Sequence, residues 1–173
     1  MKVYVTGSSR GLGRAIKKQF SKVQSEVLGL DRPEYNLDNI ENYIKNDFDI
    51  YVNNAEHYFA QTCLLYALFE TNKNRPCHII NIGSVSSDGD RKEVNEYAVQ
   101  KTALEKACTQ LTLVKSKCKV SLLKPGRMRT DMVKHIDAPK LDPREVARAV
   151  LWIAAQPEHV NVKSLSIDIM ETS

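Results

Sequence analysis

The chain alternates between short, almost wholly apolar runs and longer segments in which apolar residues recur every three or four positions. Apolar runs that lack the alternation of a half-exposed strand are typical of strands covered on both faces of a parallel sheet. We therefore expect six buried strands, at residues 3–5, 27–30, 50–52, 78–82, 120–123 and 165–170.

Helical spacing is clearest after the first run, where one apolar stripe is formed by Leu12, Ile16, Phe20 and Val23. The segment 58–69 is apolar on nearly all sides, which predicts a helix buried on more than one side. Further helices are expected at 38–46, 95–115 and 143–155, the last with Asp142 as its cap and Pro143 at its start. Strands that alternate with helices predict a single α/β domain, residues 1–173, with helices on both faces of the sheet.

Composition narrows the class of protein only slightly. The 25 basic and 21 acidic residues give a net charge of +4, and the basic residues are scattered, so no nucleic-acid partner is expected. No apolar run is long enough for a membrane span, and no signal peptide is apparent, so we expect a cytoplasmic protein with no membrane contact. The four cysteines lack metal-ligand spacing; we expect reduced core thiols and no metal.

A glycine-rich segment, TGSSRGLG at residues 6–13, lies between the first strand and the first helix. Glycines allow a tight turn and a close approach of the backbone to a ligand. The N–H groups at the start of the following helix suit a pyrophosphate. The segment therefore predicts a nucleotide site at the carboxyl ends of the strands, where ligands bind in such sheets.

Polar residues that suit chemistry follow other strands. Asn53 and Asn54 follow one strand, Ser84 follows another, and Tyr97 precedes Lys101 by four residues, about one helical turn. A lysine ammonium beside a phenol favours the phenolate and lowers its pKa, so Tyr97 is a candidate acid/base. Ser84 is a candidate hydrogen-bond donor to a substrate carbonyl.

With these motifs in order, the chain resembles the short-chain dehydrogenase/reductase family, over nearly its whole length. The resemblance implies a Rossmann-like, doubly wound parallel sheet in three layers, α/β/α. It also implies an NAD or NADP cofactor and hydride transfer between that cofactor and the carbonyl or alcohol carbon of a small-molecule substrate.

The resemblance implies roles for individual residues. Tyr97 would be the catalytic acid/base, Ser84 would orient the substrate, and Lys101 would hold the nicotinamide ribose. The residues implied in cofactor binding are Gly7, Ser9, Arg10, Gly11, Leu12, Gly13, Asp31, Arg32, Asn36, Leu37, Asn53, Asn54, Ala55, Tyr97, Lys101, Pro125, Gly126 and Thr130.

The chain departs from the family pattern in several places. It is shorter after Asp31, between Asn54 and Ser84, and after Thr130, which predicts an open substrate pocket. Glu56 replaces the glycine of the family's N-N-A-G motif, and would be strained if that position required a positive φ. His57 falls near the place of a family asparagine and is a candidate for a catalytic proton relay; a solvent-facing histidine is the alternative.

Cofactor choice and assembly are open at this point. Asp31 favours NAD by hydrogen bonding to the ribose 2′-hydroxyl, whereas Arg10 and Arg32 suit the 2′-phosphate of NADP; the balance slightly favours NAD. The apolar segment 58–69, together with 95–115, predicts a homodimer or homotetramer. An NAD(P)-dependent oxidoreductase is the leading hypothesis, and a catalytically weak or inactive dinucleotide-binding sensor or regulatory protein is the alternative.

Overall fold

A computed structural model describes residues 1–89, 94–129 and 139–170. Each predicted strand is present, and all six pair in parallel in the order β2-β1-β3-β4-β5-β6. Their bounds are Lys2–Thr6 (β1), Glu26–Leu30 (β2), Ile50–Asn53 (β3), Cys77–Ile82 (β4), Cys118–Pro125 (β5) and Ser164–Ile167 (β6). The predicted parallel α/β sheet is thereby confirmed.

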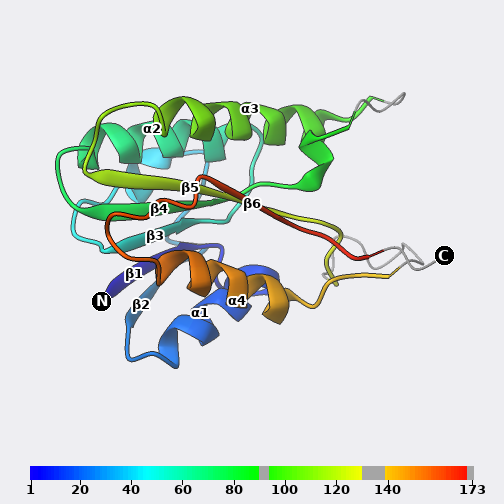
Figure 1. Cartoon of the computed structure of the whole chain (residues 1–173), viewed down its shortest axis with the longest axis horizontal. Helices are drawn as coiled ribbons and strands as arrows, with labels where there is room; N and C mark the ends of the chain where they lie inside the picture. Colours follow the sequence, from blue (N-terminus) through cyan, green and yellow to red (C-terminus); the bar gives the residue numbers. More distant parts are fainter. Residues whose placement is uncertain (90–93, 130–138, 171–173) are drawn as a thin grey trace.

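Helices cover both faces of this sheet, as Figure 1 shows. α2 (Ala60–Asn72) and α3 (Glu96–Leu111) pack together on one face, and α1 (Gly11–Ser21) and α4 (Pro143–Ala154) pack together on the other. Each face has its own apolar core, and β1 contributes Tyr4 to one core and Val3 and Val5 to the other. This three-layer arrangement is the one that the family resemblance implied.

The helix boundaries follow from local chemistry. α4 begins as predicted: Asp142 caps it, and Glu145 completes a capping box by accepting from the backbone N–H of Asp142. α1 ends at Ser21, so Val23 lies beyond it and is exposed, contrary to the predicted apolar stripe. The predicted helix 38–46 is reduced to a short 3₁₀ helix, Ile40–Tyr43, between β2 and β3.

One side of α2 is left uncovered. Leu64, Leu65 and Leu68 are fully buried, but Tyr66 and Cys63 are exposed. Within the single chain, α2 is therefore buried on one side, and burial of its other side by a partner subunit stays a prediction. The prediction that all four cysteines are core thiols is wrong at Cys63. The other three cysteines are buried.

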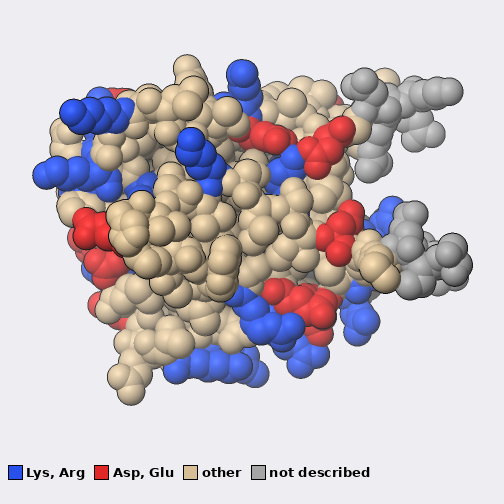
Figure 2. All heavy atoms as spheres, viewed as in Figure 1, with Lys and Arg blue, Asp and Glu red and all other residues tan. Residues whose placement is uncertain are grey.

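The sheet creates a crevice at its carboxyl edge. From β1 the chain passes to α1 on one face, and from the neighbouring β3 it passes to α2 on the opposite face. Segments that diverge from adjacent strands leave a gap between them, which is the usual ligand site of such sheets. No described helix is long and apolar enough to cross a membrane. Basic and acidic side chains lie interspersed on the face that Figure 2 shows.

Candidate active site

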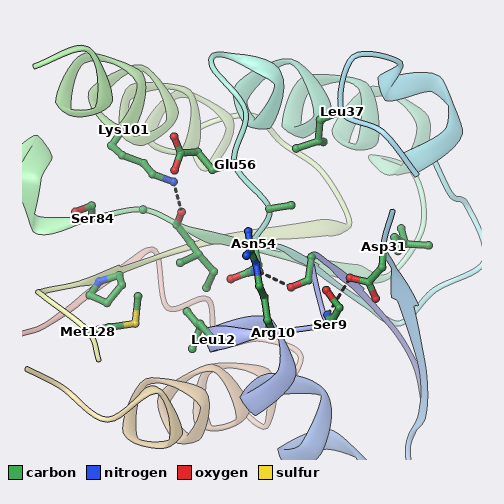
Figure 3. Close-up of a pocket in the computed structure, with 18 of the residues that line it drawn as sticks. Ser9, Arg10, Leu12, Asp31, Leu37, Asn54, Glu56, Ser84, Lys101 and Met128 are labelled. Atoms are coloured by element: carbon green, nitrogen blue, oxygen red, sulfur yellow. Dashed lines mark hydrogen bonds between the residues drawn. The ribbon is translucent and has the colours of Figure 1, made fainter. Parts of the chain in front are cut away.

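A cavity of about 950 Å³ lies along the carboxyl edge of the sheet. In Figure 3, Asp31 and Leu37 lie at one end, Ser84 and Met128 at the other, and Lys101 and Glu56 project between them from the side of α2 and α3. Most of the predicted site residues line this cavity: Gly7, Ser9, Arg10, Gly11, Leu12, Gly13, Asp31, Arg32, Leu37, Asn54, Ala55, Ser84, Tyr97, Lys101, Pro125 and Gly126.

The glycine-rich loop forms the floor of the cavity beside α1. Gly7 has φ +65°, a conformation that residues with a side chain rarely adopt. A methyl group at Gly13 would lie 2.1 Å from the carbonyl oxygen of Gly7, so only glycine lets the helix start pack on the loop. The cap residue Arg10 gives no side-chain hydrogen bond to the helix, which leaves the first N–H groups of α1 for a ligand.

The ends of β1 and β3 are tied together by polar contacts. The hydroxyl oxygen of Thr6 accepts from the backbone N–H groups of Asn54 (2.8 Å) and Ala55 (2.7 Å). The Asn54 side chain donates to the carbonyl oxygen of Thr6 at 2.9 Å. These bonds fix the cavity wall at the point where the two strands diverge.

Asp31 directly follows β2 and faces the glycine-rich loop. One of its carboxylate oxygens accepts from the Ser9 N–H (3.0 Å) and the other from the Ser8 hydroxyl (2.6 Å). The carboxylate is therefore held against the loop; Arg32 follows Asp31 in the chain and also lines the cavity, and Arg10 lines it nearer its middle, beside Asn54 (Figure 3). The acidic and the basic candidates for cofactor choice thus all line the same cavity.

Ser84 and Tyr97 meet at the opposite end. Ser84 follows β4 and caps the 3₁₀ turn Val85–Ser87, its hydroxyl oxygen accepting from the Ser86 N–H at 3.1 Å. Tyr97 lies in the first turn of α3, which Asn95 caps by accepting from the Ala98 N–H. The bond to Ser86 uses the Ser84 oxygen as acceptor and leaves the hydroxyl proton free to be donated to another group.

The Tyr97 phenol does not have the lowered pKa that the sequence suggested. Burial raises the pKa of Tyr97, a hydrogen bond with Ser84 opposes the rise, and the negative charge of Glu56 adds to it. The Lys101 ammonium lies 5.4 Å from the centre of the Tyr97 ring, over its face. The net shift is therefore opposite to the predicted one.

Lys101 is held by a residue that the sequence analysis missed. Its ammonium donates to the Gln61 side-chain oxygen (2.7 Å) and to the carbonyl oxygen of Ile82 (3.1 Å). The Gln61 amide donates in turn to the carbonyl oxygens of Asn53 (2.7 Å) and Ile82 (3.0 Å). Burial lowers the pKa of Lys101 to about 8, and the charge of Glu56 opposes this.

Two substitutions relative to the family pattern have different outcomes. Glu56 lines the cavity near Lys101, and the residue with a positive φ nearby is Tyr58 (φ 47°), so the strain expected at Glu56 is not found. His57 lies before the start of α2 and pairs with Asp38, its Nε2 2.8 Å from the Asp38 oxygen. It does not contact Lys101, whose partner is Gln61, so the structure gives no support to a relay through His57.

Asn53 and Asn36 are absent from the cavity lining, and Thr130 is not among the described residues. Asn53 is fully buried and bonds to the carbonyl oxygen of Gln61 and the side chain of Asn81, which makes it a support behind the cavity. Asn36 is outside the cavity lining and donates to Asp38 at 2.7 Å.

Comparison with known proteins found sequence relatives that are named oxidoreductases. An uncharacterized oxidoreductase of Staphylococcus aureus is 35% identical over 95 residues, which cover 52% of this chain and 41% of that protein. An uncharacterized oxidoreductase of Staphylococcus epidermidis is 26% identical over 217 residues, covering 94% of each chain. Because 217 exceeds the 173 residues of this chain, that relative has segments with no counterpart here. No family model matches the sequence.

Solved structures share the fold over nearly the whole chain. A 3-ketoacyl-(acyl-carrier-protein) reductase from Brucella melitensis complexed with NADH has a TM-score of 0.80 at 17% identity, covering 96% of both chains. A 3-alpha-hydroxysteroid dehydrogenase from Pseudomonas sp. complexed with NADH has a TM-score of 0.77 at 17% identity, covering 97% of this chain and 95% of that one. A short chain dehydrogenase from Burkholderia cenocepacia in complex with NADP has a TM-score of 0.77 at 18% identity, covering 96% and 87%.

Proposed function

We propose that this chain, which has the Rossmann-like fold of the short-chain dehydrogenases, is an NAD(P)-dependent oxidoreductase that acts on a carbonyl/alcohol pair. The observation that carries the proposal is the single cavity wall that unites the glycine-rich loop, Ser84, Tyr97 and Lys101. The oxidoreductase relatives and the NADH- and NADP-bound structures of the same fold support it.

The residues present fit a dinucleotide. The uncapped start of α1 and the close approach that Gly7 and Gly13 allow suit the pyrophosphate. Asp31 and Leu37 suit the adenosine end, and Pro125 and Gly126 line the far end where the nicotinamide would lie. When bound, the nicotinamide supplies the hydride chemistry, so the protein need only bind, orient and move a proton.

Cofactor binding, substrate orientation and proton transfer are assigned to three different side chains. Lys101 uses two donors on Gln61 and Ile82, and its third N–H, which no described residue takes up, is assigned to a ribose hydroxyl of the cofactor. Ser84, with its oxygen already accepting from Ser86, donates to the substrate oxygen. Tyr97 gives its proton to that oxygen during reduction and recovers it during oxidation.

Ser84, Tyr97 and Met128 line the end of the cavity that we assign to the substrate. Between β5 and α4, residues 130–138 lie outside the described part of the chain, and Met128 is the last cavity-lining residue before them. The longer relatives have additional segments. We propose a small-molecule carbonyl or alcohol as substrate.

We further propose that the chain forms a homodimer or homotetramer through α2 and α3. The two helices are linked by the Tyr66 hydroxyl, which donates to Gln110 at 2.7 Å. Tyr66 and Val99 are exposed apolar side chains on them, as is Cys63. Tyr66→Glu should shift the protein to a smaller sedimenting species, and a wild-type monomer at all concentrations would refute this assembly.

The experiment that tests the proposed function is a reduction assay. Oxidation of NADH or NADPH is followed in the presence of a panel of aldehydes and ketones, with Tyr97→Phe as the test variant and Tyr66→Phe as a matched loss of a phenol hydroxyl. Tyr97→Phe should lower kcat by about 10²- to 10⁴-fold and leave cofactor binding intact. Cofactor binding without turnover of any substrate would favour the alternative, a dinucleotide-binding sensor.

A further inference from the structure

Lys124, near the end of β5, is a buried cation with two acidic partners. It is 5% exposed, and its ammonium donates to Glu105 on α3 at 3.0 Å and to Asp88, next to the turn Val85–Ser87. A buried charge is stable only when it is paired and hydrogen bonded. Burial lowers the pKa of Lys124, but the bonds to Asp88 and Glu105 outweigh it, and the pKa is raised overall. Lys124 therefore joins β5, α3 and the segment after β4.

Glu105 extends this contact to the turn that carries Ser84. Its second carboxylate oxygen accepts from the Ser87 hydroxyl at 2.5 Å. The same hydroxyl lies 2.8 Å from the carbonyl oxygen of Ser84, so its single proton is shared between the two acceptors. The Ser87 N–H also donates to the Ser84 carbonyl oxygen at 3.2 Å. Glu105 thus acts on Ser84 through one intervening side chain.

The residues of α3 that make these contacts lie on the same side of the helix as Tyr97. Tyr97, Lys101 and Glu105 are four residues apart and share one face of the helix. Lys101 binds the carbonyl oxygen of Ile82 and Glu105 binds Ser87, so α3 holds the chain on both sides of Ser84.

Gly83, the residue before Ser84, lies against the stem of Lys124. A methyl group at Gly83 would lie 3.3 Å from the Lys124 Cγ and 2.9 Å from a Leu122 methyl group. The lysine stem therefore limits how far the backbone at Gly83 can move toward the sheet, while its ammonium group fixes Glu105.

We infer that Lys124 and Glu105 are positioning residues, which hold the Ser84 hydroxyl at a fixed place relative to the Tyr97 phenol; this inference rests on the proposed function. Neither residue lines the cavity, and neither does Ser87, so they act through Ser84 rather than on a ligand. Errors of about 1 Å in the placement of a catalytic group lower rates by up to about 100-fold. The contacts that join Lys124, Glu105 and Ser87, here called the Lys124 network, are thus predicted to affect turnover more than cofactor binding.

The test uses Ser87→Ala and Lys124→Met, with Thr102→Ala as a control that removes a hydroxyl from the exposed side of α3. Hydrogen exchange of residues 84–88 is measured together with kcat and the cofactor KM. Ser87→Ala should speed exchange in this segment about 10-fold and lower kcat about 10-fold, and Lys124→Met should lower kcat about 100-fold, both with the cofactor KM changed less than about twofold. Thr102→Ala should match the wild type in every measurement.

Unchanged exchange in residues 84–88, or an unchanged kcat, in Ser87→Ala would overturn the inference. So would a change spread evenly over the whole protein, because that indicates a general loss of stability. Ser87→Ala decides the matter if Lys124→Met does not fold. A wild-type protein that turns over no substrate would count against the proposed function alone, since the exchange measurement still decides whether the Lys124 network holds the Ser84 turn.

Discussion

The Lys101 ammonium donates to the side-chain oxygen of Gln61 at 2.7 Å, and both residues are almost fully buried. Gln61 is itself fixed by its bonds to the carbonyl oxygens of Asn53 and Ile82. One amide side chain therefore connects the ends of β3 and β4 to the lysine on α3. The candidate site depends on this connection for the direction in which Lys101 points.

Gln61→Leu should lower both stability and cofactor affinity. The change removes the acceptor of Lys101 and a donor to two buried carbonyl oxygens, so we expect the free energy of unfolding to fall by about 1–3 kcal/mol. The cofactor KM should rise because Lys101 is no longer oriented. Denaturant unfolding and steady-state kinetics measure the two effects. His57→Ala, which breaks the pair with Asp38 and the edge-on contact with the Tyr58 ring, is the comparison and should change both quantities much less.

Glu56→Gln should move the pH dependence of turnover to lower pH. The Glu56 charge raises the pKa of Tyr97 and opposes the lowering of the Lys101 pKa, so removing it lowers the pKa of both groups. The rate of alcohol oxidation, which needs a deprotonated acceptor, should then reach its plateau at lower pH. Glu26→Gln, at the amino end of β2, should leave the profile unchanged. A Glu56→Gln profile that coincides with the wild type, or moves upward, would contradict the assignment.

Substitution of Asp31, which follows β2, and of Arg10, at the start of α1, should shift the cofactor preference in opposite directions. Asp31→Asn removes the charge that repels a 2′-phosphate and should shift the ratio of NADPH to NADH affinity toward NADPH by about 10-fold, or about 1.4 kcal/mol. Arg10→Ala should weaken NADPH binding and leave NADH binding nearly unchanged. Fluorescence titrations of both variants with both cofactors measure these ratios. Equal effects of Arg10→Ala on the two cofactors would remove Arg10 from phosphate recognition.

His78 should make the protein sensitive to acid. Burial lowers the pKa of His78 from 6.5 to about 3, and the charge of Lys119 adds to the effect. The unfolded chain therefore binds a proton that the folded chain does not between these values, and stability should fall by about 1.4 kcal/mol per pH unit as the pH drops from 6.5 toward 3. His78→Gln should remove this slope in urea unfolding measured across that range, and His159→Gln, at an exposed site, should retain it.

Sequence patterns were sufficient for the sheet and for most of the cavity wall, because both depend on what directly follows each strand. Position along the chain placed His57 near the family asparagine, but this placement did not identify the residue that contacts Lys101, which is Gln61. α2 begins at Ala60, after Tyr58 adopts a left-handed conformation, and this brings Gln61 to the lysine. Gln61 was detectable as the polar residue within an otherwise apolar segment, YFAQTCLLYALF.

Other features could not be predicted because they depend on tertiary contacts. The Lys124 network joins residues from three elements that have no shared sequence pattern. The raised pKa of Tyr97 depends on how deeply its first helical turn is buried and on where the Glu56 carboxylate comes to lie. Neither the burial of this helical turn nor the position of the Glu56 carboxylate can be deduced from the spacing of residues along the chain.

The most direct test of the account is a fluorescence titration of the wild-type protein with NADH and NADPH. The cavity described here predicts saturable binding of one or both at one site per chain, with dissociation constants in the micromolar range. Binding that is saturable for one cofactor and much weaker for the other would also decide between Asp31 and the two arginines. The absence of saturable binding for both would contradict the dinucleotide site, and with it the proposed oxidoreductase activity.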